Sequence, residues 1–290
     1  MVKCNLLIIG VSFIIFNTLL LMLVFVMGFS KVACPSTNTK LNERIVGGRA
    51  VELDRFLYIS GIIILGYASP VLQCGGAIVS ANWVISASHC IVLLNESNVP
   101  LSKIYISSGN KEWQKGKFHK VLKMLQNQYY DHSTLTNDLA LFKVKEPFNR
   151  GTEAPIKLAG PNYKYVVNST ATVIGWGFNE SKIIQKSLFV VDVLIFSPEF
   201  CDQMWEEGAV TVDMFCAGTY TGGKDACQFD SGGPIVQHDI LIGIVSWGGE
   251  CGDKDRPGVY ARISYFIPWL EEVEVTEHLR IGYHIQDDNV

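Results

Sequence analysis

The sequence predicts an all-β fold made of antiparallel sheets. From Ile45 to about residue 265, short β-branched and aromatic runs are broken by Gly, Asn and Pro. No long segment over that stretch has the 3.6-residue period of a helix. The 26 Gly among 290 residues suit frequent tight turns. Many short strands separated by turns are typical of antiparallel barrels or sandwiches, in one large domain or two small ones.

The strand candidates follow one another at short intervals. In chain order, examples are Leu57–Leu65, Gly76–Val79, Trp83–Ser86, Lys103–Ser107, Leu139–Val144, Ala171–Gly175, Leu188–Leu194, Pro234–Val236, Ile240–Val245 and Gly258–Arg262. One segment, Tyr265–Val275, is a good helix candidate. It is apolar at Phe266, Leu270 and Val273, and Pro268 lies near its first turn. We therefore expect a C-terminal helix after the strands.

Residues 1–30 differ from the rest of the chain. Leu6 to Phe29 is a nearly continuous apolar run. A signal peptide has an apolar core of roughly 7–15 residues, whereas a membrane-spanning helix needs about 20. The length is between the two, and we favour a removed signal peptide over an uncleaved anchor, because Gly28 and Ser30 are small residues suited to cleavage. We expect a secreted, extracellular protein, with a type II membrane-anchored protein as the alternative.

The segments around the body of the protein are polar. Residues 31–44 contain Pro, Ser, Thr, Asn and Lys but little to bury, which is typical of a linker or propeptide. The body then runs over residues 45–275, and residues 276–290 form a polar C-terminal tail. The net charge of −4 gives no basic field, which argues against a nucleic-acid partner. No P-loop or dinucleotide motif is present, so we expect no cofactor.

Two further patterns agree with the secretory pathway. Asn95, Asn168 and Asn179 each begin an Asn-X-Ser/Thr triplet, the acceptor for glycosylation. The chain has eight Cys, six of them beyond residue 70, which suits an oxidising compartment. Counting alone leaves 15 ways of pairing those six cysteines.

Three residues are candidates for the chemistry of an acyl-transfer hydrolase, which needs a nucleophile, a base and an orienting acid. They occur in the order His89, Asp138, Ser231. An imidazole that titrates near neutrality can accept a serine proton and later return it to a leaving amine. A buried carboxylate facing the imidazole fixes its tautomer and stabilises the imidazolium.

The motifs around these residues resemble those of the trypsin-like (chymotrypsin-fold) serine peptidases. The segments that carry the resemblance are Trp83–Cys90 (WVISASHC), Asn137–Leu141 (NDLAL) and Lys224–Pro234 (KDACQFDSGGP). The resemblance covers Ile45 to roughly Val275. It implies two six-stranded antiparallel β-barrels, with a boundary near residues 150–160 and His89, Asp138 and Ser231 in the cleft between them. It also implies a secreted serine endopeptidase that works through an acyl-enzyme.

The resemblance extends to the substrate pocket. Asp225 lies six residues before Ser231, where the trypsin branch of the family has the acid that favours Arg or Lys substrates through a charge-assisted pair. Ser246, Gly248 and Gly258 match residues that line such a pocket and leave it open. Ala226 replaces a serine common in trypsins, which favours Arg over Lys. Glu250 adds a negative charge where trypsins usually have Gly.

The start of the body resembles an activation site. The sequence Arg44–Gly48 (RIVGG) implies cleavage after Arg44, after which the new ammonium of Ile45 would pair with Asp230. The uncleaved chain would then be an inactive zymogen. The resemblance also implies the disulfides Cys74–Cys90, Cys201–Cys216 and Cys227–Cys251, and leaves Cys34 without an evident partner. The segment from Gly109 to His119 has one acid, Glu112, so we expect no metal site.

One residue of the expected oxyanion hole departs from the family pattern. Phe229 stands where the family has the glycine whose N–H, with that of Ser231, forms the oxyanion hole. Glycine permits backbone angles that a bulky residue resists, so we expect altered catalytic efficiency or a narrowed substrate range.

The expected partners are peptides or proteins with Arg or Lys at the cleavage site, protein protease inhibitors and an activating protease. The alternative is a catalytically weak homologue that acts as a binding protein.

Overall fold

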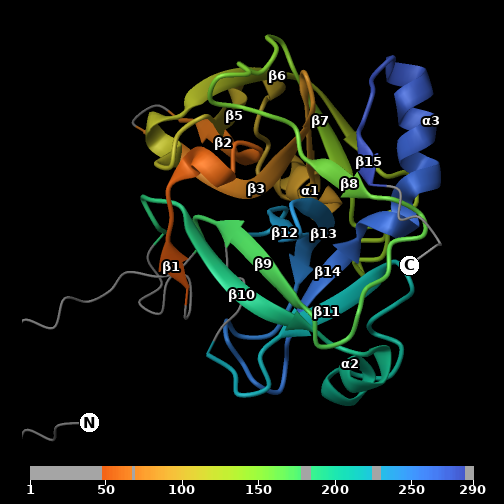
Figure 1. The fold of residues 1–290 in the computed structure, drawn as a ribbon. Helices are drawn as coiled ribbons and strands as arrows, with labels where there is room; N and C mark the ends of the chain where they lie inside the picture. The colour runs from red at the N-terminus through yellow and green to blue at the C-terminus, as the bar shows by residue number, and fades with distance from the viewer. Residues whose placement is uncertain (1–47, 67–68, 178–183, 224–229, 285–290) are drawn as a thin grey trace, which may run out of the picture. The chain divides into compact units, whose positions relative to one another are not determined.

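Two closed rings of six antiparallel strands make up the body of the chain in the computed structural model (Figure 1). The structure describes residues 48–66, 69–177, 184–223 and 230–284, which all belong to one unit spanning residues 42–290. The first ring has the order β2-β3-β4-β7-β6-β5 and closes through the pairing of β2 with β5. Its strands are β2 (Ile59–Leu65), β3 (Pro70–Ser80), β4 (Trp83–Ser86), β5 (Ile104–Ser108), β6 (Lys117–Gln126) and β7 (Ala140–Val144).

The second ring is drawn in green to blue in Figure 1. Its order is β12-β9-β10-β11-β14-β13, and the pairing of β12 with β13 closes it. Its strands are β9 (Thr170–Gly175), β10 (Phe189–Ile195), β11 (Met214–Gly218), β12 (Pro234–Gln237), β13 (Ile240–Trp247) and β14 (Gly258–Arg262). Three short strands extend the sheet: β1 (Arg49–Ala50) on β10, β8 (Lys157–Ala159) parallel to β13, and β15 (Tyr283–His284) parallel to β8. The predicted pair of six-stranded barrels is therefore confirmed.

In the described part of the chain, three α-helices and four short 3-10 turns connect the strands. The α-helices are α1 (Ser88–Glu96), α2 (Pro198–Met204) and α3 (Ile267–Glu277), and the 3-10 turns are η1 (Leu53–Arg55), η2 (Leu101–Lys103), η3 (Trp113–Lys115) and η4 (Ile263–Phe266). The predicted C-terminal helix is present, with Pro268 in its first turn. Helices α1 and α2 were not expected, because nine and seven residues are too short to show a clear period.

All ten predicted strands are present, with ends that differ by up to six residues. Strand β3 is the largest difference, since it begins at Pro70 rather than Gly76. Strands β6 and β11 of the two rings were missed, as were the short strands β1, β8 and β15. Strand β6 is rich in Lys and buries only two of its ten side chains well, and β11 is five residues long with no exposed face to produce an alternating pattern.

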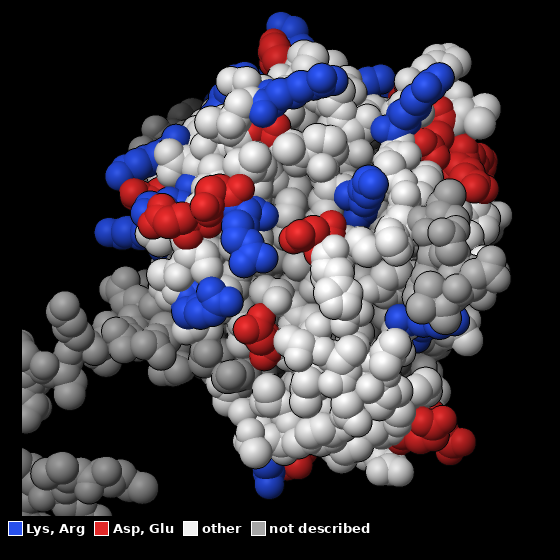
Figure 2. Space-filling model, in the orientation of Figure 1, with Lys and Arg blue, Asp and Glu red and all other residues white. Residues whose placement is uncertain are grey.

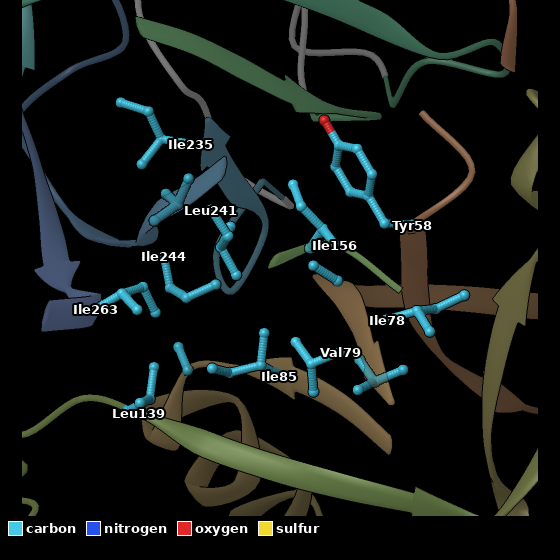
Figure 3. Packing of buried hydrophobic residues seen from close by; sticks show 14 of the residues in the cluster. Tyr58, Ile78, Val79, Ile85, Leu139, Ile156, Ile235, Leu241, Ile244 and Ile263 are labelled. Carbon is cyan, nitrogen blue, oxygen red and sulfur yellow. The ribbon is translucent and has the colours of Figure 1, made fainter. Parts of the chain in front are cut away.

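A continuous hydrophobic cluster joins the two rings. Figure 3 shows Ile78 and Ile85 of the first ring in the same cluster as Ile235 and Ile244 of the second. These four side chains are fully buried, and burial of each stabilises the fold by about 1.5–3 kcal/mol. Because both rings contribute to one core, loops from the two rings that lie near it are held in fixed positions.

Two of the predicted disulfides are present. Cys74–Cys90 links β3 to α1, and Cys201–Cys216 links α2 to β11. Each closes a loop of about 15 residues and contributes about 3 kcal/mol in the chain-entropy model. Cys251 is disulfide-bonded, and its predicted partner Cys227 lies outside the described residues.

The surface charge, the described helices and the C-terminal segment relate to the predictions about nucleic acid, the membrane and the polar tail. On the face shown in Figure 2, basic and acidic side chains are interspersed. Within the described ranges, no helix is both long and apolar enough to cross a membrane, and the apolar run from Leu6 to Phe29 lies outside those ranges. The C-terminal segment is polar in sequence, yet Leu279 and Ile281 are buried and the chain returns to the sheet at β15.

A buried acid network stabilises the end of the first ring. The carboxylate of Glu153 contacts His119 Nε2 at 2.8 Å and accepts hydrogen bonds from Ser108 Oγ and the Asn149 N–H, both at 2.5 Å. Glu153 and His119 have side-chain exposures of 0%. Burial raises the pKa of Glu153, but the hydrogen bonds from His119, Ser108 and Asn149 outweigh it and hold the pKa below its usual range.

This network predicts a pH-dependent contribution to stability. Because the folded-state pKa of Glu153 is depressed, its contribution is present above the unfolded-state value of about 4.3 and is lost as pH falls through the folded-state value. Urea titrations of the wild type and Glu153→Gln should therefore show a difference in unfolding free energy that is largest near pH 7. The difference should shrink below about pH 4. Exposed Glu146→Gln is the control, and a pH-independent difference for Glu153→Gln would contradict the prediction.

Candidate active site

His89 and Asp138 meet at the start of α1 and the entry to β7. His89 is the second residue of α1, and its Nδ1 lies 2.7 Å from Asp138 Oδ2. The His89 backbone N–H donates to Asp138 Oδ1 at 2.8 Å. Ser88 Oγ donates to the Leu139 carbonyl at 2.7 Å, which ties the helix to the residue after the acid. Both the main chain and the ring of His89 are thus fixed to Asp138.

A third donor reaches the same carboxylate from the second ring. Ser246, on β13, donates a short hydrogen bond from its Oγ to Asp138 Oδ2. Asp138 is 1% exposed, so its negative charge is stabilised by these donors rather than by water. Since Nδ1 faces a carboxylate, its proton is held there and Nε2 is the ring nitrogen left to accept a proton. Sequence analysis placed Ser246 at the pocket but did not foresee this contact.

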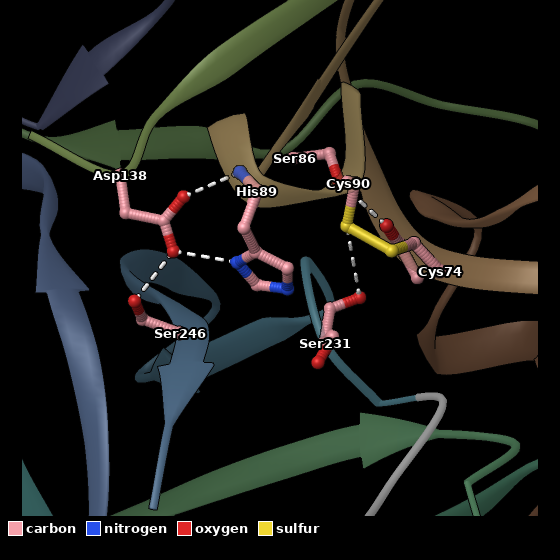
Figure 4. The surroundings of a disulfide bond; sticks show 8 residues. Cys74, Ser86, His89, Cys90, Asp138, Ser231 and Ser246 are labelled. Atoms are coloured by element: carbon pink, nitrogen blue, oxygen red, sulfur yellow. Dashed lines mark hydrogen bonds and ion pairs between the residues drawn. A yellow bond between two sulfur atoms is a disulfide. The ribbon is translucent and has the colours of Figure 1, made fainter. Parts of the chain in front are cut away.

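The turn that carries Ser231 is held by both rings. Gly75, on β3, donates its N–H to the Ser231 carbonyl at 2.8 Å. On the other side, the Gly232 N–H donates to the Val245 carbonyl at 2.8 Å. Gly232 has a φ of +76°, and a Cβ there would lie 2.1 Å from Ser86 Oγ, so only glycine fits. Figure 4 shows the ring of His89 between the Asp138 carboxylate and Ser231.

The Cys74–Cys90 disulfide packs beside this turn. Cys90 Sγ lies 3.8 Å from the Ser231 carbonyl oxygen. A disulfide sulfur carries no hydrogen, so this is a packing contact (Figure 4). In the described part of the chain, Cys74, His89 and Cys90 are the one group with metal-ligand spacing. Their two sulfurs are bonded to each other and cannot act as thiolate ligands.

Asp230 occupies a notch formed by two glycines. Its carboxylate is fully buried and accepts the Gly177 N–H at 2.8 Å. A Cβ on Gly175 would lie 2.0 Å from Asp230 Oδ1, and one on Gly177 would lie 2.2 Å from Oδ2. The notch therefore requires glycine at both positions. This Gly-Trp-Gly triplet was not among the residues predicted from the sequence, although two glycines around a tryptophan at a strand end are a signal of close backbone approach.

The described pocket residues lie close together. A Cβ on Gly248 would be 3.4 Å from the Gly258 Cα, so these glycines face one another across the same gap. Trp247 packs edge-on against Trp205 with ring centroids 4.8 Å apart, a contact that sequence analysis missed. Glu250, two residues after Gly248, is exposed to solvent. The other predicted site residues, Arg44, Ile45, Asp225, Ala226, Cys227 and Phe229, lie outside the described residues.

Comparison with known proteins agrees with this geometry. The family model described as Trypsin matches residues 45–270. The chain belongs to the trypsin family. It is 35% identical over 212 residues to a trypsin of Phaedon cochleariae, covering 70% of this chain and 79% of that protein. It is 34% identical over 236 residues to a trypsin of Simulium vittatum, covering 79% and 92%. Trypsin-2 of Salmo salar is 35% identical over 205 residues, covering 70% and 85%.

Membership of the trypsin family and the fold together identify a serine endopeptidase. The family is shared over both rings, since the matched residues begin before β1 and end within α3. The activity and the architecture inferred from the sequence are therefore confirmed at this level.

The glycine notch predicts that Gly175→Ala strongly lowers the rate of proteolysis. The added Cβ cannot share space with the Asp230 carboxylate, so Asp230 and the adjoining Ser231 must shift. A displacement of about 1 Å at a catalytic group lowers turnover by about 100-fold or more. The measurement is kcat on a small ester substrate, with circular dichroism to establish folding. Gly151→Ala is the control, because the nearest atom to its Cβ would be 3.5 Å away. A fully active Gly175→Ala enzyme would contradict this account of Asp230.

Proposed function

We propose that the chain is a trypsin-like endopeptidase in which Ser231 is the nucleophile, His89 the general base and Asp138 the orienting acid. The observation that carries the proposal is the Asp138 carboxylate, which is bound by His89 Nδ1, the His89 N–H and Ser246 Oγ beside the Ser231 turn. His89 Nε2 takes the proton of Ser231 Oγ as that oxygen attacks the scissile carbonyl. The imidazolium then gives the proton to the leaving amine, and an acyl-enzyme remains. Water, activated by the same imidazole, hydrolyses it.

The oxyanion hole is assigned to the N–H groups of Phe229 and Ser231. Phe229 still carries a donor, so the hole is not deleted by the replacement of glycine. If the backbone angles that suit phenylalanine turn this N–H away, one donor is lost, which costs about 3–4 kcal/mol of transition-state stabilisation. If the N–H keeps its direction, the ring narrows the approach of substrates and inhibitors. Either effect modifies efficiency or substrate range.

Cleavage after Arg, and less well after Lys, is assigned to Asp225. A carboxylate at the base of a substrate pocket binds a guanidinium in a charge-assisted pair. The facing glycines Gly248 and Gly258 support an open pocket that admits a long side chain. Ala226 lacks the hydroxyl that could assist an ammonium, which accounts for the preference for Arg.

Activation by cleavage after Arg44 is assigned to the buried Asp230. The new ammonium of Ile45 would pair with this carboxylate in the notch formed by Gly175 and Gly177. A buried carboxylate is a favourable partner for an ammonium, since pairing compensates both for lost hydration. The uncleaved chain would lack this pair between the Ile45 ammonium and Asp230 and would therefore be inactive. The activating protease is a trypsin-like enzyme or the protein itself.

Secretion and glycosylation complete the proposal. A signal peptide in residues 1–30 and the disulfides fit an oxidising, extracellular compartment. Asn95 and Asn168 are exposed, as an acceptor must be, and Asn179 lies outside the described residues. The partners are Arg- or Lys-containing protein substrates and protein inhibitors. The alternative, a catalytically weak binding protein on this scaffold, rests on Phe229 alone.

The decisive experiment uses the chain cleaved after Arg44. Turnover of a small Arg ester should fall by about 10⁶-fold in Ser231→Ala, because that variant lacks the nucleophile. The Arg ester should be cleaved faster than the Lys ester, and Asp225→Ser should remove the preference of both over an apolar ester. Uncleaved chain is the control for activation. Equal rates for the wild type and Ser231→Ala would sink the proposed mechanism.

Phe229 yields a separate prediction. Phe229→Gly should raise kcat on the Arg ester by about tenfold or more and increase inhibition by protein inhibitors, since glycine frees the donor and removes the ring. The measurements are kcat and the inhibition constant of a protein inhibitor. Phe229→Tyr is the matched control, because it keeps the bulk and should leave both unchanged. If Phe229→Gly behaves like the wild type, the position does not limit the enzyme.

A further inference from the structure

Besides Ser246, another residue of the second ring, Asp213, holds the backbone next to Asp138. The Asn137 N–H donates to Asp213 Oδ2 at 2.7 Å. Asn137 directly precedes Asp138 on the way into β7, whereas Asp213 directly precedes β11 in the second ring. Asp213 is 4% exposed, so water does not compete effectively for this hydrogen bond.

The backbone at Asn137 needs such support. Leu135 and Asn137 both have a φ of +57°, in the left-handed region that residues other than glycine rarely adopt. The Asn137 side chain donates to the Tyr129 carbonyl at 3.1 Å, and the Leu139 N–H donates to the Asn137 carbonyl at 2.9 Å. These bonds hold the loop within the first ring. The bond to Asp213 fixes the main chain of this loop to the second ring.

The acceptor on Asp213 is itself rigid. Thr211 Oγ1 donates to the other carboxylate oxygen of Asp213. The Asp213 carbonyl accepts the Arg262 N–H at 2.7 Å, where the chain enters β11. Arg262 also donates from Nε and Nη2 to the Met214 carbonyl at 3.0 and 2.8 Å. Thr211 and the backbone of Asp213 thus fix this carboxylate independently of Asn137, and its Oδ2 is left in place to accept the Asn137 N–H.

We propose that Asp213 is a positioning residue for the Asp138–His89 pair. Ser246 fixes the carboxylate of Asp138, and Asp213 fixes the peptide group that carries it, so the second ring determines both the position and the direction of the acid. Asp213 acts through Asn137 and touches neither the substrate nor the reacting atoms. The inference rests on the roles proposed above for Asp138 and His89.

The test compares Asp213→Ala with Asp213→Asn in the cleaved enzyme. Asp213→Ala removes the acceptor and should lower kcat by about 10- to 100-fold while KM stays within about twofold. The proton resonance of His89 Nδ1–H should move upfield, because its hydrogen bond to Asp138 weakens. Asp213→Asn keeps an oxygen that accepts from Asn137, so it should restore kcat and the resonance to near wild-type values.

The controls separate positioning from general destabilisation. Tyr165→Phe removes another hydrogen bond of the second ring, from the Tyr165 hydroxyl to the Ile242 carbonyl, and should leave kcat and the resonance unchanged. If Asp213→Ala does not accumulate as folded protein, Thr211→Val decides, with a smaller loss of kcat and the same direction of resonance shift.

The outcomes distinguish this inference from the mechanism on which it rests. Activity that survives in Ser231→Ala contradicts the proposed function. If Ser231→Ala is inactive and Ser246→Ala lowers kcat, but Asp213→Ala is as active as the wild type, the inference about Asp213 alone is overturned. A loss of kcat in Asp213→Ala without movement of the His89 resonance also overturns it, since it would show a structural role only.

Discussion

The central interaction of the structure is that of the buried Asp138 carboxylate, whose hydrogen-bond donors come from both rings. A charge with 1% exposure is costly unless several donors replace water. Here the first ring supplies both donors of His89, and the second supplies the hydroxyl of Ser246. The shared hydrophobic core holds these groups together, because residues such as Ile85 and Ile244 belong to one cluster. The site is therefore a property of the junction between the rings.

The turn that carries Ser231, the proposed nucleophile, likewise depends on both rings. Ser231 is held through its carbonyl by Gly75 of β3 and through the next residue by Val245 of β13. Glycine is needed wherever main chains or the Asp230 carboxylate approach this turn closely, as at Gly175 and Gly232. These contacts leave little freedom around Ser231 and so hold it in a fixed relation to His89. Preorganisation of this kind is what a transition state of changing charge requires.

The sequence predicted the fold class, ten of the strands, the C-terminal helix and two disulfides that the structure contains. Short β-branched runs such as Ala171–Gly175 indicated the strands. The resemblance of motifs such as that around His89 to those of the trypsin-like serine peptidases implied the two barrels and the disulfides. Strand β6 was missed because its exposed Lys residues hide the pattern, and α1 because it is short. The contacts of Asp138 with Ser246, and of Asn137 with Asp213, join residues 108 and 76 positions apart. No local pattern encodes such pairs, since they arise only when the rings close and pack.

The central claim is that Ser231 is activated by an imidazole that Asp138 orients. The most direct measurement is the rate and position of covalent labelling by an organophosphonate that mimics the tetrahedral intermediate, followed by mass spectrometry. The cleaved enzyme should be labelled on Ser231 with a stoichiometry near one, and Asp138→Asn should react about 10⁴-fold more slowly because it favours the wrong tautomer of His89. Labelling of another residue, or equal rates for the two proteins, would contradict the account.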